Sequence, residues 1–365
     1  MAGLEAAQAA LHGNDDPGLL LVFAGGAYDL PVVIGAISEI AAGIPLVGCT
    51  SSGEIDATGP ARDSIVVLAL GGAGLTFSVA AVTGNAPREA GARVAACVGD
   101  IADRPHRVLL LLADGPAAIH ADIVRGAYSV AGAGVPLVGG IAGHPDFGRD
   151  ERHAVVYGGS VLHDAVVGVA IGSDAPLGLG VRHGWQEVGE PLLVTRAEAG
   201  RVLELDDRPA AEVYRELLGG GDLPDAVVLS HPLGMQQRVG EAHIRSVALD
   251  DAPDGGFWCA APAGALVWLM EAEPESVLAA ADLACAEAIG ALDGAAPQAL
   301  LTFGCAARLQ FLGGAAAAPA ADEIARVARH AGDAVVAGLY THGEIARTRG
   351  IVGYHHQTFV VLAVA

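Results

Sequence analysis

The stretch Gly48-Cys49-Thr50-Ser51-Ser52-Gly53-Glu54-Ile55 decides the fold, because Gly338-Leu339-Tyr340-Thr341-His342-Gly343-Glu344-Ile345 returns its pattern near the C-terminus. The opening glycine and the final Gly-Glu-Ile of the two stretches align without a gap. A short apolar run and a helical stretch precede each one, and a Val-rich run follows. The pattern therefore predicts two copies of one strand–helix–strand unit.

A third copy lies between these two. Pro136-Leu137-Val138-Gly139 repeats Pro45-Leu46-Val47-Gly48, and an apolar strand ending at Asp114-Gly115 precedes it. Its turn reads Gly140-Ile141-Ala142-Gly143, so the glutamate of the other copies is absent. Val227–Ser230 is interpreted as a fourth first strand, which ends at His231.

This rhythm predicts an α/β protein whose repeated strand–helix–strand units form mixed, largely parallel sheets with antiparallel hairpin additions. A chain of 365 residues is longer than one hydrophobic core usually allows, which favours two domains. We expect an N-terminal extension over residues 1–16, an N-terminal domain over 17–203 and a C-terminal domain over 204–365.

Composition narrows the class of partner and the compartment. The formal net charge of -22 opposes binding to nucleic acid or to anionic membranes. No uninterrupted apolar run reaches the roughly 18 residues that a membrane helix needs, and the N-terminus lacks a signal-peptide pattern. The five cysteines are odd in number and form no C-x-x-C, which indicates free thiols in a reducing compartment. We expect a cytoplasmic protein.

Ligands of open α/β sheets bind beyond the carboxyl ends of the strands, so we look for a site there. Glycines at these ends allow backbone N–H groups to approach a ligand, and a few polar side chains provide specificity. The candidate ligand-binding residues are Ser51, Ser52, Glu54, Gly139, Gly140, His231, Cys305, Arg308, Tyr340, Thr341, Glu344 and Thr358.

The charged candidates suit a zwitterion. Arg308 could clamp a carboxylate, and Glu54 or Glu344 could receive an ammonium group, while neutral hydroxyls supply hydrogen bonds. Alternatively, each glutamate braces its own turn, and Arg308 pairs with a turn carboxylate such as Glu344. Nucleotide binding is excluded, because Glu54 stands where a phosphate-binding loop needs lysine.

Two other kinds of site stay open. His231 precedes Pro232, whose ring restricts the backbone, and this suits a ligand contact or a haem ligand; the alternative is a histidine bonded to backbone. Cys49 and Cys305 could be nucleophiles if a histidine such as His231 or His342 is adjacent. The sequence contains no G-x-S-x-G, H-E-x-x-H or C-x-x-C-H motif.

Taken in order, these motifs resemble the FIST family over nearly the whole chain. The first stretch, Val138-Gly139-Gly140 and His183-Gly184-Trp185 resemble the FIST N-terminal domain, and Leu203–Ala210 resembles its junction with the C-terminal domain. The motifs similar to the second domain are His231-Pro232-Leu233-Gly234, Phe303-Gly304-Cys305-Ala306-Ala307-Arg308, Tyr340–Ala346 and Gln357-Thr358.

The resemblance implies a sensory module in intracellular signal transduction that binds small molecules such as amino acids. Some members of the family are haem-binding nitric-oxide sensors. The chain has no kinase, cyclase or receiver segment, so its signalling partner is expected to be encoded separately. The leading hypothesis is a non-enzymatic sensor of an amino acid or similar metabolite, without a cofactor. The alternatives are a haem-based gas sensor that uses His231 and a cysteine-dependent hydrolase or transferase.

Overall fold

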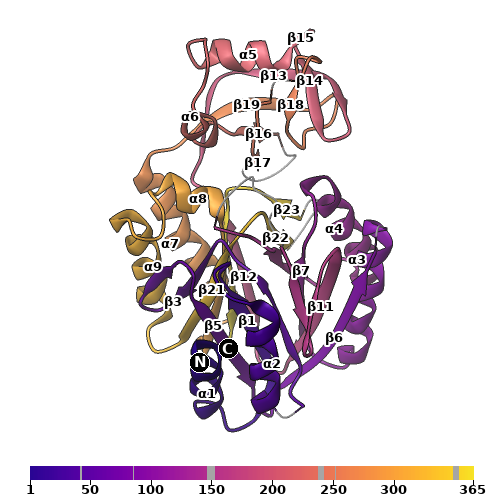
Figure 1. Ribbon diagram of the computed structural model, residues 1–365, viewed down its shortest axis with the longest axis vertical. Coiled ribbons are helices and arrows are strands. Elements are labelled where there is room, and N and C mark those ends of the chain that lie inside the picture. Colours follow the sequence, from indigo (N-terminus) through magenta and orange to yellow (C-terminus); the bar gives the residue numbers. More distant parts are fainter. Residues whose placement is uncertain (42, 85, 146–152, 237–241, 251, 348–352) are drawn as a thin grey trace.

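The protein has a body of three β-sheets with helices around them, and a smaller cap at one end (Figure 1). The cap is the segment 186–271. The computed structural model describes residues 1–41, 43–84, 86–145, 153–236, 242–250, 252–347 and 353–365.

Three units of the body share one pairing pattern. In each unit the first strand lies between a parallel second strand and an antiparallel closing strand. In the first unit the strands are β1 (Pro17–Ala24), β2 (Leu46–Thr50) and β5 (Ile65–Gly71); in the middle unit β7 (His106–Ala113), β8 (Leu137–Ile141) and β11 (Ala165–Ser173); in the last unit β20 (Ala299–Cys305), β21 (Val335–Thr341) and β24 (Phe359–Val364). The helices between first and second strands are α2 (Leu30–Ala41), α4 (Ala117–Ala131) and α9 (Ala318–Ala331).

Each unit also extends a neighbouring sheet with the strands that follow its turn. β3 of the first unit pairs with β21, β9 of the middle unit pairs with β2, and β22 of the last unit pairs with β8. These strands and their partners are β3 (Gly53–Asp56) with β4 (Gly59–Ala61), β9 (Val155–Tyr157) with β10 (Ser160–Leu162), and β22 (Glu344–Arg347) with β23 (Tyr354–His355). β6 (Leu75–Thr83) and β12 (Leu177–Arg182) complete the sheets at β11 and β24.

The prediction of largely parallel sheets is wrong. Among the strand pairs that the structure describes, parallel pairing is confined to β1–β2, β7–β8 and β20–β21. The closing strand returns beside the first strand, and the exchanged strands arrive from another unit, so both kinds of neighbour run antiparallel. The class is mixed α/β. The domain limits and the internal duplication stay predictions.

The core lies between the three sheets, with further apolar layers under the helices. Along β1, Leu19, Leu21 and Phe23 join the central cluster, whereas Leu20 and Val22 pack under the helices. This alternation follows from the two-residue period of a strand, and it explains why the strands are apolar on both faces. The remaining helices of the body are α1 (Ala2–His12), α3 (Pro87–Ala95), the 3₁₀ turn η1 (Ala96–Ile101), α7 (Pro274–Gly290) and α8 (Ala306–Phe311).

The cap has a core of its own, centred on Tyr214 and Phe257. It contains β13 (Gln186–Glu198), β14 (Arg201–Leu205), β15 (Arg208–Pro209), α5 (Ala210–Leu217), α6 (Asp225–Leu229), β16 (Leu233–Met235), β17 (His243–Arg245), β18 (Phe257–Trp258) and β19 (Leu266–Glu271). In Figure 1, β17 faces β22 and β23 of the body.

The predicted fourth first strand at Val227–Ser230 is wrong, since these residues largely form helix α6. Pro224 precedes the helix and Asp225 lies in its first turn, both of which favour a helix start. A short apolar run does not by itself distinguish strand from helix. No helix among the described residues is both long and apolar enough to cross a membrane.

Candidate functional site

The turns after β2, β8 and β21 meet in a ring of backbone hydrogen bonds. Each turn donates one N–H to the strand end of another unit, so all three units are joined where their second strands finish. The bonds are Ser52 N–H to Tyr340 O (2.9 Å), His342 N–H to Ile141 O (3.1 Å) and Gly143 N–H to Thr50 O (3.0 Å). The carboxyl ends of strands from separate units are thereby brought together.

Glu54 and Glu344 brace their turns against the closing strands. Glu344 accepts the backbone N–H of Thr358 at 3.0 Å and its hydroxyl at 2.7 Å, and it also accepts the hydroxyl of Thr341 at 2.8 Å. Glu54 accepts the backbone N–H of Ser64 at 2.8 Å and its hydroxyl at 2.7 Å, together with the hydroxyl of Ser51. Both glutamate side chains are fully buried.

In the middle unit, which lacks the turn glutamate, Asp114 makes the equivalent hydrogen bonds to the closing strand. It accepts the backbone N–H of Asp164 at 2.9 Å and that of Ala165 at 2.5 Å, at the start of β11. Asp114 was expected at a strand end but not among the candidate site residues. The signal was available, since the unit that lacks a turn glutamate is the one whose first strand ends in aspartate.

Burial raises the pKa of the Glu344 carboxyl to about 7, and the hydrogen bonds from Thr358 and Thr341 oppose this shift. Burial likewise raises the pKa of Glu54, against the hydrogen bonds from Ser51 and Ser64. A carboxylate is costly in such surroundings unless donors surround it, and here the hydroxyls and the amides supply them.

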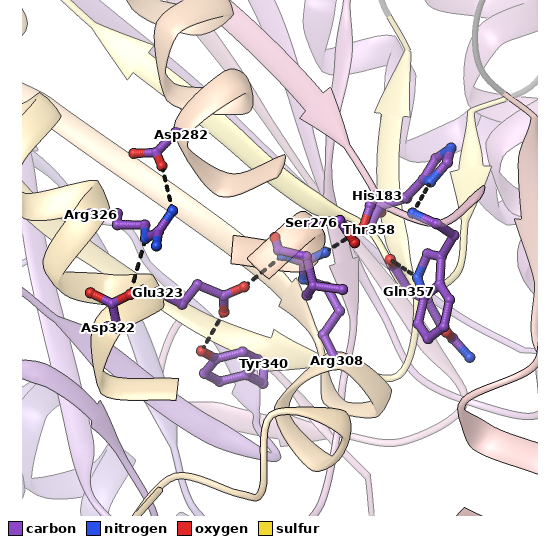
Figure 2. A network of polar contacts seen from close by, with 12 residues as sticks. His183, Ser276, Asp282, Arg308, Asp322, Glu323, Arg326, Tyr340, Gln357 and Thr358 are labelled. Atoms are coloured by element: carbon purple, nitrogen blue, oxygen red, sulfur yellow. Dashed lines mark hydrogen bonds and ion pairs between the residues drawn. The ribbon is translucent and has the colours of Figure 1, made fainter. Parts of the chain in front are cut away.

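Arg308 pairs with Glu323 and not with Glu344. The two side chains are fully buried, and Nη2 of Arg308 lies 2.6 Å from Oε1 of Glu323 (Figure 2). The same guanidinium donates to His183 O and Val277 O, both at 2.7 Å. Tyr340 donates its hydroxyl to the other oxygen of Glu323 at 2.9 Å. Arg308 and Tyr340 therefore belong to a polar network beneath α7 and α9.

A cavity of about 590 Å³ opens at the ends of β7, β8, β20 and β21. This volume is within the range of small-molecule sites, and the position agrees with the expected place of a ligand. We call it the histidine cavity, because its lining includes His120, His153, His163, His342 and His356, next to Cys305, Tyr354, Ser246, Asp114 and Asp164.

The buried histidines of this cavity are neutral. Nε2–H of His120 donates to Gly115 O at 3.1 Å, so its Nδ1 accepts from the hydroxyl of Tyr354, also at 3.1 Å. Burial lowers the pKa of His120 to about 4 and that of His342 to about 3. The cavity wall thus offers neutral hydrogen-bonding groups, while the carboxylate of the exposed Asp164 contributes negative charge at its edge.

Of the predicted site residues, Cys305 lines the cavity, and Thr341, Glu344 and Thr358 form a hydrogen-bonded cluster next to it. Gly140 is the strand partner of Glu344, and an added Cβ there would lie 2.4 Å from Thr341 Cγ2. The structure places the other predicted residues apart from this group. Those are Ser51 and Glu54 in the first turn, Ser52 bonded to His144 O, Gly139 packed on β7, Tyr340 and Arg308 in the buried network, and His231 in the cap.

The histidine proposed as a haem ligand lies away from the histidine cavity, and two histidines of the cavity use ring nitrogens in hydrogen bonds. His231 is absent from the lining of the histidine cavity, and its Nδ1–H donates to Val227 O at 2.7 Å. His120 uses both ring nitrogens, and His342 accepts the His144 N–H on Nε2. Coordination through either nitrogen of His120, or through Nε2 of His342, would cost an existing hydrogen bond.

The cysteine alternative requires a thiolate. Burial raises the pKa of both Cys305 and Cys49 well above the ordinary value, with nearby Glu344 and Asp114 adding to the respective shifts. A buried thiol without an adjacent cation is a poor nucleophile. Burial therefore favours the neutral thiol of both cysteines.

The comparisons with known proteins decide the family. The FIST N domain matches residues 18–208, more than half of the chain, and the FIST C domain matches residues 210–347. The chain belongs to the FIST family. A stretch of 84 residues is 33% identical to the protein described as Uncharacterized protein MJ1623 of Methanocaldococcus jannaschii. That alignment covers 23% of this chain and 16% of the relative.

FIST N and FIST C are sensory domains, so this FIST protein has a role in signalling or small-ligand sensing. Such domains are generally non-catalytic.

Proposed function

We propose that this FIST protein is a non-enzymatic sensor that binds a small polar metabolite, with amino acids as the first class to test, in the histidine cavity. The observation that supports this most is the position of the cavity. Strand ends from the middle and last units converge on it, and a cap residue, Ser246, lines it together with residues of the body. A ligand there would contact the middle unit, the last unit and the cap.

The polar groups of the cavity suit a zwitterion. Asp164 at the exposed edge and Asp114 behind it could receive an ammonium group, because each carboxylate oxygen accepts more than one hydrogen bond. The neutral hydroxyl and imidazole groups suit the carboxylate end. Cys305 would contact the ligand, and Glu344 with Thr341 and Thr358 would hold the wall in place from behind.

This arrangement assigns the predicted roles of Arg308 and Glu54 to structure. The guanidinium of Arg308 is engaged by Glu323 and two carbonyls, and the carboxylate of Glu54 is engaged by Ser51 and Ser64. The signal would then pass to a signalling protein.

A thermal-shift screen with the twenty amino acids tests the proposal. A ligand at about 100 times its dissociation constant adds roughly 2.7 kcal/mol of stability, which is readily measured. The shift should fall in Asp164→Asn and stay unchanged in His12→Ala, a change on the exposed face of α1. If Asp164→Asn and wild type shift equally, the assignment of this cavity is wrong. Haem is screened alongside by its absorbance spectrum, and a Soret shift on reconstitution would favour the gas-sensor alternative instead.

A further inference from the structure

His356 lies on a short segment that joins the cavity to the cap. This segment, Tyr354–Thr358, is called the strap. Tyr354 and His356 line the histidine cavity, with their rings edge-to-face at 4.9 Å between centroids. Thr358 at the other end is held by Glu344, so the strap is fixed directly beside the ligand space.

One hydrogen bond decides which ring nitrogen of His356 carries the proton. The backbone N–H of Ser246, in the cap, donates to Nδ1 of His356 at 3.0 Å. An imidazole nitrogen that accepts a hydrogen bond carries no proton, so the neutral ring carries its proton on Nε2. Burial and the nearby Arg245 lower the pKa of His356 well below its ordinary value, so the ring is neutral at pH 7.

The Nε2–H that results has no partner in the part of the chain that the structure describes. Among the described residues, the Nε2 atom of His356 is buried without a hydrogen bond. A buried donor without an acceptor is costly, so a ligand that supplies an oxygen to it gains free energy on binding. A cation or a metal ion recovers nothing, because the nitrogen presents hydrogen and not a lone pair.

We propose that His356 is the specificity-determining residue of the histidine cavity, donating Nε2–H to a carboxylate or carbonyl oxygen of the ligand. This rests on the proposed function and names the chemistry of its ligand. It also assigns Ser246 the role of a positioning residue, because its N–H keeps the ring in the tautomer that donates.

Ligand binding and cap docking are therefore coupled. The Ser246–His356 bond crosses from the cap to the body, and two further bonds cross beside it. Arg245 donates to Tyr354 O at 3.1 Å, and Gln357 donates to Leu229 O, also at 3.1 Å. A ligand oxygen at Nε2 makes Nδ1 a better acceptor through polarisation of the ring, which strengthens the contact with the cap.

Nitrogen NMR of histidine-labelled protein at pH 7 tests the tautomer without any ligand. We expect the His356 ring, assigned by its loss in His356→Gln, to show the Nε2–H pattern. An Nδ1–H or doubly protonated ring would overturn the proposal. Hydrogen exchange at the Ser246 amide gives a second readout. Its protection should drop at least tenfold in His356→Leu, and unchanged protection would also overturn the proposal.

The ligand arm uses amino acids, their amides and the corresponding amines that lack the carbonyl carbon. We expect the acids and amides to shift the melting temperature of wild type and the amines not to. The shift should disappear in His356→Leu and return in part in His356→Gln, whose amide can accept from Ser246 and donate to the ligand. Equal binding of amines, or full binding by His356→Leu, contradicts the proposal. If no probe binds wild type, the amino-acid function fails, while the tautomer and exchange results still decide the role of His356.

Discussion

Arg308 and Glu323 form an ion pair in which both side chains are fully buried, with 2.6 Å between Nη2 and Oε1 (Figure 2). Tyr340 donates to the second oxygen of Glu323, so this carboxylate serves residues from β21 and α8 together. Such pairs contribute little net stability relative to apolar residues, but loss of one member leaves a buried charge uncompensated. The pair therefore holds α9 in position against α8 and β21.

Replacing Arg308 with Met should lower the free energy of unfolding by about 3–5 kcal/mol, because Glu323 is left buried and unpaired. The matched control is Arg125→Met, which breaks an exposed pair with Asp122 and should cost less than about 1 kcal/mol. Urea denaturation measures both. The double variant Arg308→Met/Glu323→Leu should be more stable than Arg308→Met alone, and equal or lower stability would contradict this account.

Replacing Glu344 with Gln should change how stability depends on pH. The folded pKa of about 7 is above the ordinary value of 4.5, so the folded state holds the extra proton between these values. The wild-type free energy of unfolding therefore falls as pH rises through this window, and the glutamine variant lacks that fall. From pH 5 to 8 the stability advantage of wild type should shrink on the order of 2 kcal/mol. Parallel curves would refute this. Glu39→Gln, on the exposed face of α2, is the control.

The units could be predicted from sequence, but their assembly could not. The pattern around Gly48 and Gly338 located the strands, turns and helices of each unit, because apolar period and turn residues are local signals. The exchange of β3 and β22 between sheets is not local. Glu54 and Glu344 lie in similar turns whose next strands join different sheets, and only packing of the three units decides this.

Gly139→Ala should destabilise the protein strongly, whereas Gly35→Ala should not. Gly139 has a φ of 138°, and a Cβ there would lie 1.9 Å from Leu111 O on the neighbouring strand. A loss of about 2–4 kcal/mol is expected. Gly35 is in helix α2 with nothing within 4 Å of an added Cβ, so alanine should stabilise by about 0.5–1 kcal/mol. Thermal and urea unfolding of both variants check the contrast, and similar effects would refute it.

The place of the candidate site could be predicted better than its residues. Ligand space beyond strand ends follows from the topology of α/β units, and Cys305 was found in this way. His120 and His356 were not predicted as ligand-binding residues, since they are far apart in the sequence and carry no spacing motif. The partner of Arg308 could not be predicted for the same reason, because Glu323 is brought to it by the packing of α9.

The buried histidines should make the protein lose stability in mild acid. His120, His183 and His355 have folded pKa values of about 4, below the ordinary 6.5, because burial disfavours the charged ring. As pH falls from 6.5 towards 4, these histidines become protonated in the unfolded chain but stay neutral in the folded protein. Each such histidine then lowers the free energy of unfolding by about 1.4 kcal/mol per pH unit. The three histidines together exceed the opposite contribution of the single Glu344.

His120→Gln isolates one of these contributions. Gln can still donate to Gly115 O and accept from Tyr354, but it does not titrate, so the loss of stability between pH 6.5 and 5 should be smaller by about 2 kcal/mol. His12→Gln, at the exposed end of α1, serves as the control and should keep the wild-type slope. Urea titrations at pH 7, 6 and 5 measure the slopes. A slope in His120→Gln equal to that of wild type would mean that His120 charges in the folded protein, and the cavity wall would then be cationic rather than neutral.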